Sequence, residues 1–445
     1  MRSVLHPARA VALAFLMVIA LGTALLMLPF AHADQAAGPA APVLVAFFTS
    51  VSAVCVTGMT IVDTGTYWSG FGQGVIMALF QFGGFGMMTA ATLLGLLVNN
   101  SPRLRTKLIS QMETSTLGLG DVTSVARLVL VVTFASELLI ATLLTLRMHF
   151  AYDLPWAQAM WSGAFHAVSA FSNAGFSIHA DSVTRYAGDA LILAPLMIAI
   201  VAGGIGFPVL HDLRRKLRDP RHWSMHTKLT LLGTAVLLVA GFLGVLLFEW
   251  HNQRTLGAMG LGDKLLSASF MSVAARTAGF NAVDIGALTP ESWALHYFLM
   301  FVGGGSASTA GGVKVGTVVI LALLVIAEVR GFRDTEAFGR RLGASAQRQA
   351  ITVVVLGCGM VALGTLVLLH VSDFPTDRII FEVVAAFGTA GLSTGITPAL
   401  PPSGQLTLAL LMFLGRVGTV TLAASLVLGE RRLPYRYPEE HPIVG

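Results

Sequence analysis

The chain has 445 residues, of which 55% are hydrophobic and 11% charged, and its formal net charge is +5. Soluble domains carry roughly 25% charged residues, so the composition excludes an ordinary soluble protein and places most of the chain in a membrane. Basic residues cluster beside apolar segments, which argues against nucleic acid as a partner. The two cysteines, Cys55 and Cys358, stand in apolar sequence, so we expect neither a disulfide nor a metal site.

The first quarter of the chain, residues 1–100, begins with an apolar run long enough to cross a membrane. This run, Val11–Phe30, is followed by Pro42–Ser52, which is too short to cross, and by Gly72–Val98, which is long enough. Basic residues before the run and Ala31-His32-Ala33 after it leave a secretory signal over residues 1–33 as the alternative. We favour a first membrane helix because the later quarters repeat the same order.

The three later quarters each contain an outer helix, a short helix and a second long helix. These expected helices are Val122–His149, Ala157–Phe171 and Ala187–Leu210 in residues 101–215; Lys228–Trp250, Lys264–Ala274 and Trp293–Ala327 in residues 216–345; and Ala350–His370, Asp377–Ala386 and Gly404–Leu428 in residues 346–445, which end in a polar tail. The pattern predicts an all-α integral membrane protein with four tandem helix–pore-loop–helix repeats around a pseudo-fourfold central pore.

Each short helix runs into a loop that contains a glycine. Four such loops around one axis could offer backbone carbonyls that replace the water of a K⁺ ion, and glycine adopts the unusual dihedral angles that this requires. Turns or helix contacts are the alternative for a single glycine, but four matched copies favour a filter. The candidate K⁺-binding residues are Val56, Thr57, Gly58, Asn173, Ala174, Gly175, Thr277, Ala278, Gly279, Thr389, Ala390 and Gly391.

The second long helix of residues 216–345 contains a run of small residues that should break it. Glycine costs roughly 1 kcal/mol relative to alanine in a helix, and broken helix at membrane depth is tolerated where it lines a cavity or is buried. We expect a flexible gating loop beneath the filter; a phosphate-binding loop and simple close packing are the alternatives. The candidate gating residues here are Gly303, Gly304, Gly305, Ser306, Ala307, Ser308, Thr309, Ala310, Gly311, Gly312 and Lys314.

Three basic side chains stand within this apolar sequence. Arg416 should face water or a partner, so we interpret it as a gating residue, a positive barrier in the pore, with a salt bridge or carbonyl contact as the alternative. Arg276 should brace its loop from behind, because a side chain directed into the filter would repel cations. Lys314 could reach the cytoplasmic side or pair with an acid, and the candidate acids are Glu113, Glu137 and Glu382.

Charge placement predicts the orientation of the chain. Lysine and arginine follow every quarter, which places these connections and both termini in the cytoplasm. The opposite side is acidic and should concentrate cations at the mouth of the pore. The acidic residues on that side are Asp63, Asp153, Asp181, Asp189, Asp263, Asp284, Glu291 and Asp373.

Four segments carry a resemblance to a known family: Val54–Met59, Ser172–Phe176, Arg276–Phe280 and Thr389–Ser393. The chain resembles the membrane subunit of the Trk/Ktr/HKT superfamily of potassium transporters, closest to the Ktr type. The resemblance implies K⁺ as substrate, with Na⁺ as a second candidate that would make the protein a symporter. A glycine in all four loops is similar to the K⁺-selective members, whereas Na⁺-preferring relatives carry serine in the first. The gating loop departs from the family pattern, because Ala307-Ser308-Thr309 stands where Gly-Ser-Thr is usual.

The same resemblance implies partners. It implies a homodimer in the lipid bilayer, regulated by a cytosolic ring of nucleotide-binding subunits. The compact build and the absence of a targeting extension lead us to expect a bacterial plasma (inner) membrane. His166 and Asn173 are interpreted as packing and loop-shaping residues. The chain carries no hydrolase or kinase motif, so we expect no enzyme activity and no cofactor. A secondary transporter of another solute with discontinuous helices is the alternative function.

Overall fold

The computed structural model describes residues 7–33, 41–99, 119–216 and 218–418, and most of these residues are helical. Glu113 and the predicted cytoplasmic tail lie outside the described residues. The helices are α1 (Pro7–Leu26), α2 (Val43–Val54), α3 (Thr64–Tyr67), α4 (Gly70–Asn99), α6 (Leu119–Tyr152), α7 (Trp156–Phe171), α8 (Ala190–Ile205), α9 (Phe207–Lys216), α10 (Met225–Glu249), α11 (Leu261–Ala274), α12 (Pro290–Phe301), α13 (Val315–Val329), α14 (Ala344–Val371), α15 (Thr376–Gly388) and α16 (Pro402–Phe413).

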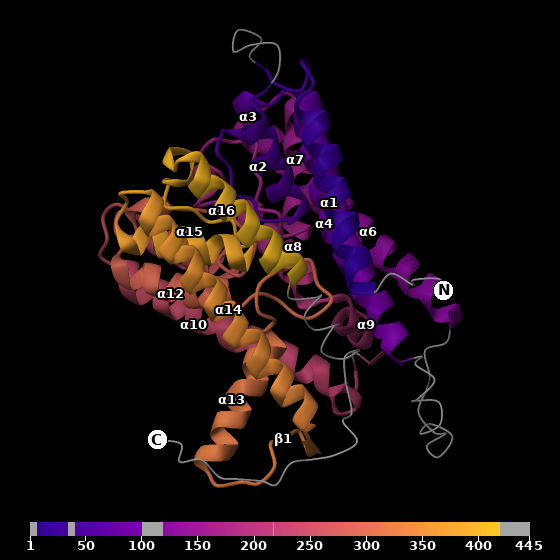
Figure 1. Ribbon diagram of the computed structural model, residues 1–445. Coiled ribbons are helices and arrows are strands. Elements are labelled where there is room, and N and C mark those ends of the chain that lie inside the picture. Colours follow the sequence, from indigo (N-terminus) through magenta and orange to yellow (C-terminus); the bar gives the residue numbers. More distant parts are fainter. Residues whose placement is uncertain (1–6, 34–40, 100–118, 217, 419–445) are drawn as a thin grey trace.

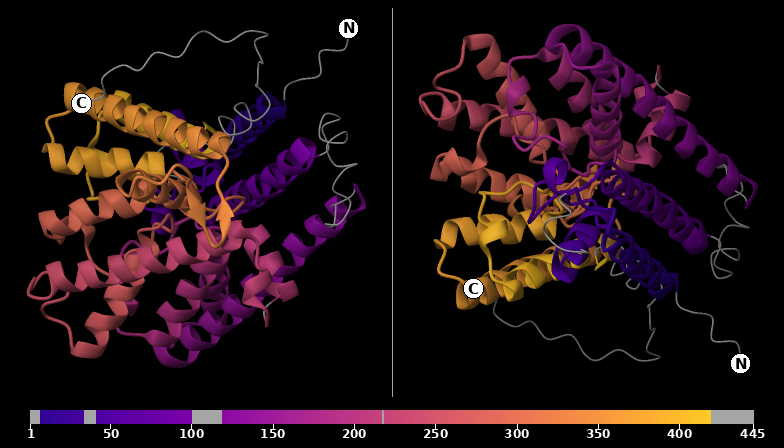
Figure 2. Two further views of the ribbon diagram at one scale, coloured as in Figure 1. Left: turned by 90° about the horizontal axis from the view of Figure 1, so that it is seen from below. Right: turned by 90° about the horizontal axis from the view of Figure 1, so that it is seen from above.

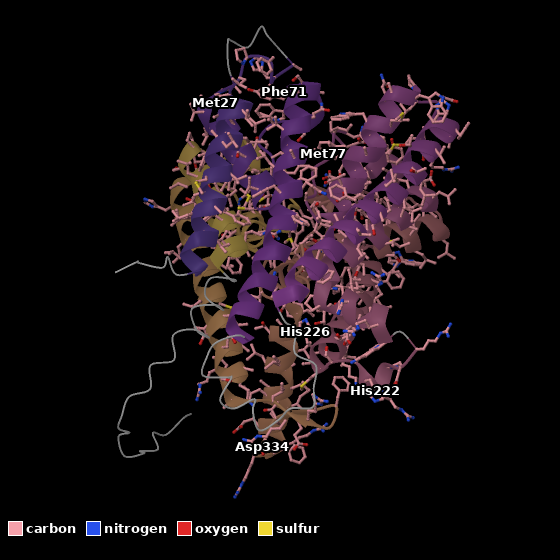
Figure 3. The ribbon with its side chains drawn as sticks, turned by 90° about the vertical axis from the view of Figure 1, so that its right-hand side faces the viewer. Met27, Phe71, Met77, His222, His226 and Asp334 are labelled. Atoms are coloured by element: carbon pink, nitrogen blue, oxygen red, sulfur yellow. The ribbon has the colours of Figure 1, made fainter. Side chains whose placement is uncertain are left out.

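The helices surround a common centre. In Figure 1, α3 lies at one end of the molecule and β1 at the other, and viewed along that direction the groups of helices follow one another in chain order around the centre (Figure 2). Side chains mark the same two ends, with Met27 and Phe71 at one and His222 and Asp334 at the other (Figure 3). Segments far apart in sequence therefore meet near the axis of the molecule.

Long apolar helices form the outside of the molecule. Among the described residues, Val129–Tyr152 of α6, α10 and α14 are long and apolar enough to cross a membrane, and α8 with α9 would be a fourth crossing if this bent pair is one span. Only 17–28% of the most apolar window in these three helices is buried inside the protein. Apolar side chains therefore face outward, as expected for helices in contact with lipid.

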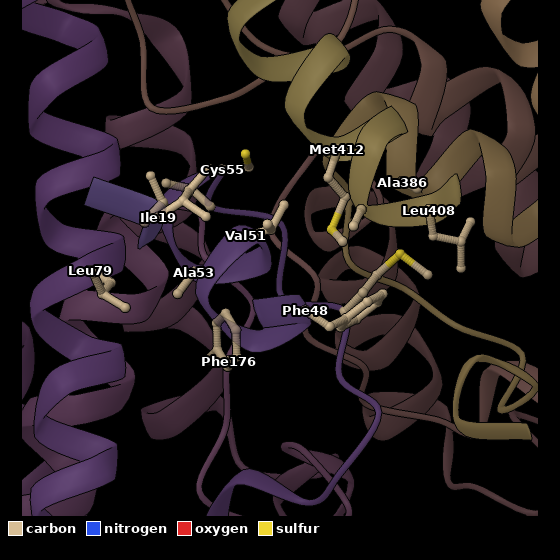
Figure 4. Packing of buried hydrophobic residues seen from close by; sticks show 14 of the residues in the cluster. Ile19, Phe48, Val51, Ala53, Cys55, Leu79, Phe176, Ala386, Leu408 and Met412 are labelled. Carbon is tan, nitrogen blue, oxygen red and sulfur yellow. The ribbon is translucent and has the colours of Figure 1, made fainter. Parts of the chain in front are cut away.

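The short helices α2, α7, α11 and α15 lie inside this shell, and each begins at a residue that limits helix extension. Proline precedes α2, α7 and α15 and glycine precedes α11; the N-cap residues are Pro42, Pro155, Pro375 and Gly260. Their small, apolar faces allow close packing. Phe48 of α2, for example, lies with Leu408 and Met412 of α16 in one buried cluster (Figure 4).

The structure differs from the expected helices at three places. The second helix of residues 101–215 is not continuous, because α8 and α9 meet at an angle of 99°. Gly206 lies at the bend with φ +100°, a conformation that disfavours other residues. Residues 336–341 form a two-stranded antiparallel hairpin, β1 (Glu336–Ala337) with β2 (Arg340–Arg341), and α16 gives way to a π-helical turn over Leu414–Gly418.

Candidate functional site

Four loops follow the short helices and share an unusual backbone. We call them loop 1 (Val56–Gly58), loop 2 (Asn173–Gly175), loop 3 (Thr277–Gly279) and loop 4 (Thr389–Gly391). The first residue of each has φ between +50° and +75°, and the glycine at its end has φ between +69° and +87°. The glycines tolerate this backbone, whereas valine and threonine are strained in it. An unusual backbone that recurs at four matched positions, three of them strained, is typical of a functional site.

The loops meet in a ring through their backbones. A Cβ on Gly175 would lie 2.7 Å from the carbonyl oxygen of Ala278, and one on Gly279 would lie 3.1 Å from that of Ala390. The glycine of loop 1 faces the carbonyl of Ala174 in the same way, and the glycine of loop 4 faces the carbonyl of Thr57. Each loop therefore presents the carbonyl before its glycine to the preceding loop, and loop 4 closes the ring onto loop 1.

This arrangement adds a second reason for glycine at each position. Any side chain there would collide with backbone atoms of a neighbouring loop, independently of φ. The structure therefore brings the four loop glycines together with the carbonyl oxygens of Thr57, Ala174, Ala278 and Ala390. Binding of K⁺ by the twelve candidate residues stays a prediction. Rings of backbone oxygens are how proteins replace the water of a small cation.

The side chain of Asn173 points away from the ring. In the orientation that satisfies all its neighbours, the amide oxygen of Asn173 accepts hydrogen bonds from Thr309 Oγ1 at 3.1 Å and from the Gly204 amide at 3.3 Å. The amide nitrogen of Asn173 donates hydrogen bonds to the carbonyls of Ile200 and Ala170. All four partners lie behind the loop. The side chain of Asn173 therefore joins loop 2 to α7, α8 and Thr309, and its loop-shaping role stays a prediction.

A cavity of about 250 Å³ opens on one side of the ring. All four ring glycines line it, as do Asp63 and His179. Two of the acids that were expected to make this side negative are paired with arginine: Asp181 contacts Arg185 at 2.6 Å and Asp189 contacts Arg147 at 2.8 Å. The field at the mouth is therefore weaker than the count of acids suggests.

The other side of the ring faces a non-helical segment between α12 and α13, which we call the broken segment (Val302–Lys314). Gly303 is in contact range of the Thr277 side chain, and Gly311 and Gly312 approach Thr389 and Gly388. Backbone hydrogen bonds join the segment to α8, from Gly305 N to Gly204 O at 2.8 Å and from Thr309 N to Gly203 O at 3.2 Å. Three of the predicted gating glycines, Gly303, Gly311 and Gly312, therefore lie against the loops or the residue before them, whereas Gly304 and Gly305 lie against the end of α8.

The three basic side chains contact backbone oxygens. Arg416 donates to the carbonyls of Thr309 and Gly83, the latter at 3.2 Å. Arg276 donates to Thr234 O at 3.5 Å and to Gly303 O at 3.3 Å, behind loop 3 as expected of a brace.

Lys314 does not pair with the acids suggested for it within the described residues. Its Nζ donates to the carbonyl oxygen of Ala310 at 2.5 Å. Glu137 instead accepts a hydrogen bond from Gln81 at 3.0 Å. Glu382 accepts hydrogen bonds from residues that follow loop 4, such as Thr394. The suggestion of an acid partner was wrong for these two glutamates, because each is held by neutral donors on its own neighbouring elements.

Sequence reasoning interpreted His166 as a packing and loop-shaping residue without naming its partner, and it missed the corresponding role of Glu382. His166 of α7 contacts Ser177 at 2.9 Å, and Glu382 of α15 contacts Ser393 at 2.9 Å, so each bonds to the residue two positions beyond a ring glycine. Their equal distance in sequence from Gly175 and Gly391 is visible in the sequence. That spacing could have identified them.

Taken together, outward-facing apolar helices, short internal helices and four strained loops around one centre define an integral membrane protein of the transport class. The family model described as TrkH, cation transport protein, matches residues 6–429, and the chain belongs to this family. It is therefore a member of a family of transporters, which is not a class of enzymes.

Two relatives are similar over their full length. The chain is 36% identical to the Ktr system potassium uptake protein B of Bacillus subtilis, with 99% of this chain and 97% of the relative covered. It is 34% identical to the potassium/sodium uptake protein NtpJ of Enterococcus hirae, with 100% and 98% covered.

A solved structure has the same fold. The potassium transporter TrkH from Vibrio parahaemolyticus superposes with a TM-score of 0.72 at 18% identity, covering 95% of this chain and 85% of that one. The all-helical membrane fold predicted from the sequence is thereby confirmed.

Proposed function

We propose that this protein takes up K⁺ across the plasma membrane through a filter formed by loops 1–4. The observation that carries the proposal is the ring of carbonyls from Thr57, Ala174, Ala278 and Ala390, each set against the glycine of the neighbouring loop. The printed names of the two relatives, a potassium and a potassium/sodium uptake protein, support the same substrate. The residues named for loops 1–4 would coordinate K⁺ through backbone oxygens.

The chemistry requires no group beyond the chain and the ion. The short helices end at the loops, so the partially negative ends of their backbone dipoles favour a cation near the ring. The cavity on the other side of the ring collects cations from solution, and the carbonyls then replace water as the ion enters. Exit requires that the path beneath the ring open.

The broken segment and Arg416 form the proposed gate. The segment lies against the inner ends of loops 2, 3 and 4, and Arg416 holds its Thr309 carbonyl. A positive charge at this depth raises the energy of a passing cation, and glycines give the segment alternative backbone conformations. Movement of the segment together with Arg416 would open the path.

We further propose the setting in which this gate works. The chain is organised as four repeats with boundaries near residues 100, 215 and 345, both termini are cytoplasmic, and two copies associate in the bacterial inner membrane. A cytosolic nucleotide-binding ring would move the broken segment from below. Basic residues near α9 and the hairpin offer docking sites for it, including Arg214, Arg215, Arg340 and Arg341.

Flux measurements test the function directly. Purified protein in liposomes should move K⁺ and Rb⁺ at least about tenfold faster than Na⁺, because a ring of carbonyls discriminates by size and field strength. Equal movement of all three ions, or none of them, would reject the proposed filter. K⁺ uptake that is stimulated by an inward Na⁺ gradient would identify symport. K⁺ uptake in importer-deficient cells, measured with and without the candidate regulatory ring, would test regulation.

A further inference from the structure

Two of the short helices carry a buried polar side chain at the same distance before the ring glycine. His166 of α7 stands nine positions before Gly175, and Glu382 of α15 stands nine positions before Gly391. Both side chains are inside the protein, at 1% and 0% exposure. Buried polar groups are costly unless they are hydrogen-bonded, so the partners of these two groups show what they hold.

His166 connects its own helix to the chain beyond loop 2. Its Nδ1 lies 2.8 Å from the carbonyl oxygen of Ser162 and must donate to it, so in the neutral ring Nε2 is an acceptor. Nε2 lies 2.9 Å from Ser177 Oγ, which therefore donates to it. The His166 ring also stacks on His179 with 4.9 Å between centroids. Because Ser177 lines the cavity two positions beyond Gly175, the histidine fixes the outer end of loop 2.

Glu382 makes the equivalent connection for loop 4 with more hydrogen bonds. Its Oε1 accepts from Ser393 Oγ at 2.9 Å, from Thr394 N at 2.8 Å and from Thr394 Oγ1 at 2.9 Å. Its Oε2 accepts from Thr397 Oγ1 at 2.5 Å. All of these donors are neutral, and together they hold the segment that leaves Gly391 against α15.

Loops 1 and 3 lack this connection among the described residues. The residue nine positions before Gly58 is Thr49, whose Oγ1 has no hydrogen-bond partner among the described residues. The residue nine positions before Gly279 is the apolar Phe270. Loops 2 and 4 are not neighbours in the cyclic order of the ring, because each loop contacts the next one in the chain. The two polar connections therefore brace the ring from opposite sides.

We propose that His166 and Glu382 are positioning residues for ion selectivity, which fix the width of the carbonyl ring by holding the outer ends of loops 2 and 4. The inference rests on the proposed function, because selectivity has meaning only if the ring conducts. Neither side chain touches the ion in this proposal. Each acts through the segment that it holds, in the way that hydrogen-bond partners orient the ligands of other cation sites.

Removal variants test the proposal through a ratio of fluxes. Groups that orient ligands typically change metal affinity about 10–100-fold when mutated, so Glu382→Ala and His166→Phe should each raise the Na⁺/K⁺ flux ratio in liposomes by about fivefold or more. Glu382→Gln should stay within about twofold of wild type, because its amide oxygen can keep the three bonds at Oε1 while its nitrogen donates to Thr397.

Two buried groups elsewhere in the chain serve as matched controls. Glu249 accepts hydrogen bonds from Thr289 N, Asn252 and Thr255 but holds none of the four loops. His296 contacts the carbonyl of Ser292 at 2.7 Å, as His166 contacts that of Ser162. Glu249→Ala and His296→Phe should lower thermal stability and leave the flux ratio unchanged.

The outcomes separate this inference from the function beneath it. Two outcomes overturn the positioning role alone, provided that wild type prefers K⁺. One is an unchanged Na⁺/K⁺ flux ratio in Glu382→Ala and His166→Phe, and the other is an equal change of that ratio in Glu249→Ala. Wild-type protein that moves no K⁺ overturns both proposals. Should either removal variant fail to fold, Ser177→Ala and Ser393→Ala delete the loop side of each contact, and unchanged ratios in those variants overturn it equally.

Discussion

The guanidinium group of Arg416 donates to the carbonyl oxygen of Thr309, and its other terminal nitrogen donates to Gly83 O at 3.2 Å. One buried side chain thereby joins the broken segment to α4 beneath the ring. The contact satisfies part of the hydrogen-bonding capacity of a charge that would otherwise be costly at this depth. It also keeps that charge beside the proposed ion path, so the residue that makes this structural contact is also the one to which the proposed gating role is assigned.

Arg416→Ala is expected to raise K⁺ flux by about tenfold, since a unit charge several ångströms away in a partly aqueous path contributes about 1–4 kcal/mol and each 1.4 kcal/mol of barrier is about tenfold in rate. The change in flux can be measured as Rb⁺ uptake into liposomes at matched protein content. Arg416→Lys retains the charge and should remain close to wild type. A lower flux in Arg416→Ala with normal expression would assign the residue a structural role only.

Gly58→Ser should raise Na⁺ flux relative to K⁺. A side chain at Gly58 meets the carbonyl of Ala174 and is strained at φ +87°, so the ring must deform. We expect the Na⁺/K⁺ ratio to rise by about fivefold or more, because selectivity depends on the spacing and field of the carbonyls. Competition of Na⁺ against Rb⁺ uptake provides the measurement.

Gly70→Ser is the matched control for this prediction. A Cβ at Gly70 meets nothing within 4 Å, and Gly70 lies at the start of α4, outside the ring. Its selectivity should equal that of wild type. An unchanged ratio in Gly58→Ser would count against loop 1 as part of a filter.

Much of the helical fold is predictable from sequence because strong local patterns set the boundaries. The short segment Pro42–Ser52 predicts α2, observed at Val43–Val54, and Lys264–Ala274 predicts α11, observed at Leu261–Ala274. Proline or glycine before each short helix and a loop glycine after it mark the ends. The four loops could likewise be found by their spacing, although their role in ion binding stays a prediction.

Other features depend on contacts between distant residues and escape sequence reasoning. The bend at Gly206 accompanies hydrogen bonds from Phe207 N to Ala307 O and from Gly305 N to Gly204 O, about a hundred positions apart in sequence. Positive φ at Val56 and Thr389 contradicts the local preference of β-branched residues. The direction of a buried side chain such as Lys314 follows from the oxygens available after folding, and residue type alone does not specify it.

Ser308→Ala should increase K⁺ flux in the absence of any regulatory subunit. Ser308 Oγ donates to Gly305 O at 2.6 Å and accepts from Ala310 N at 3.2 Å, so it closes a turn in the broken segment. Each hydrogen bond is worth about 1 kcal/mol, so the loss of both, about 2 kcal/mol, should favour open conformations by about thirtyfold. The control is Ser269→Ala, whose hydroxyl bonds only to Leu265 O at the surface of α11 in the described residues. Equal flux in Ser308→Ala and wild type would argue against a gating role for this turn.

Asp63→Asn should weaken K⁺ capture at low ionic strength. Asp63 lines the cavity outside the ring and has no ion pair among the described residues, whereas Asp181 is paired with Arg185. The hydrogen bond from Arg185 lowers the pKa of Asp181, so its charge is present and neutralised at every pH above about 4, its normal range. Asparagine preserves the capping contact of Asp63 with Gly65 N, which limits any loss of stability.

The KM for K⁺ of Asp63→Asn should therefore rise about two- to threefold at 10 mM ionic strength, where the Debye length is about 30 Å. The difference should shrink at 0.15 M, where screening acts within about 8 Å. Asp181→Asn, the matched control, removes a carboxylate that is already compensated and should change KM less at both ionic strengths. Initial rates of Rb⁺ uptake at graded concentrations measure both variants. If Asp181→Asn has the larger effect, Asp63 is not the acid that attracts K⁺ to the mouth of the pore.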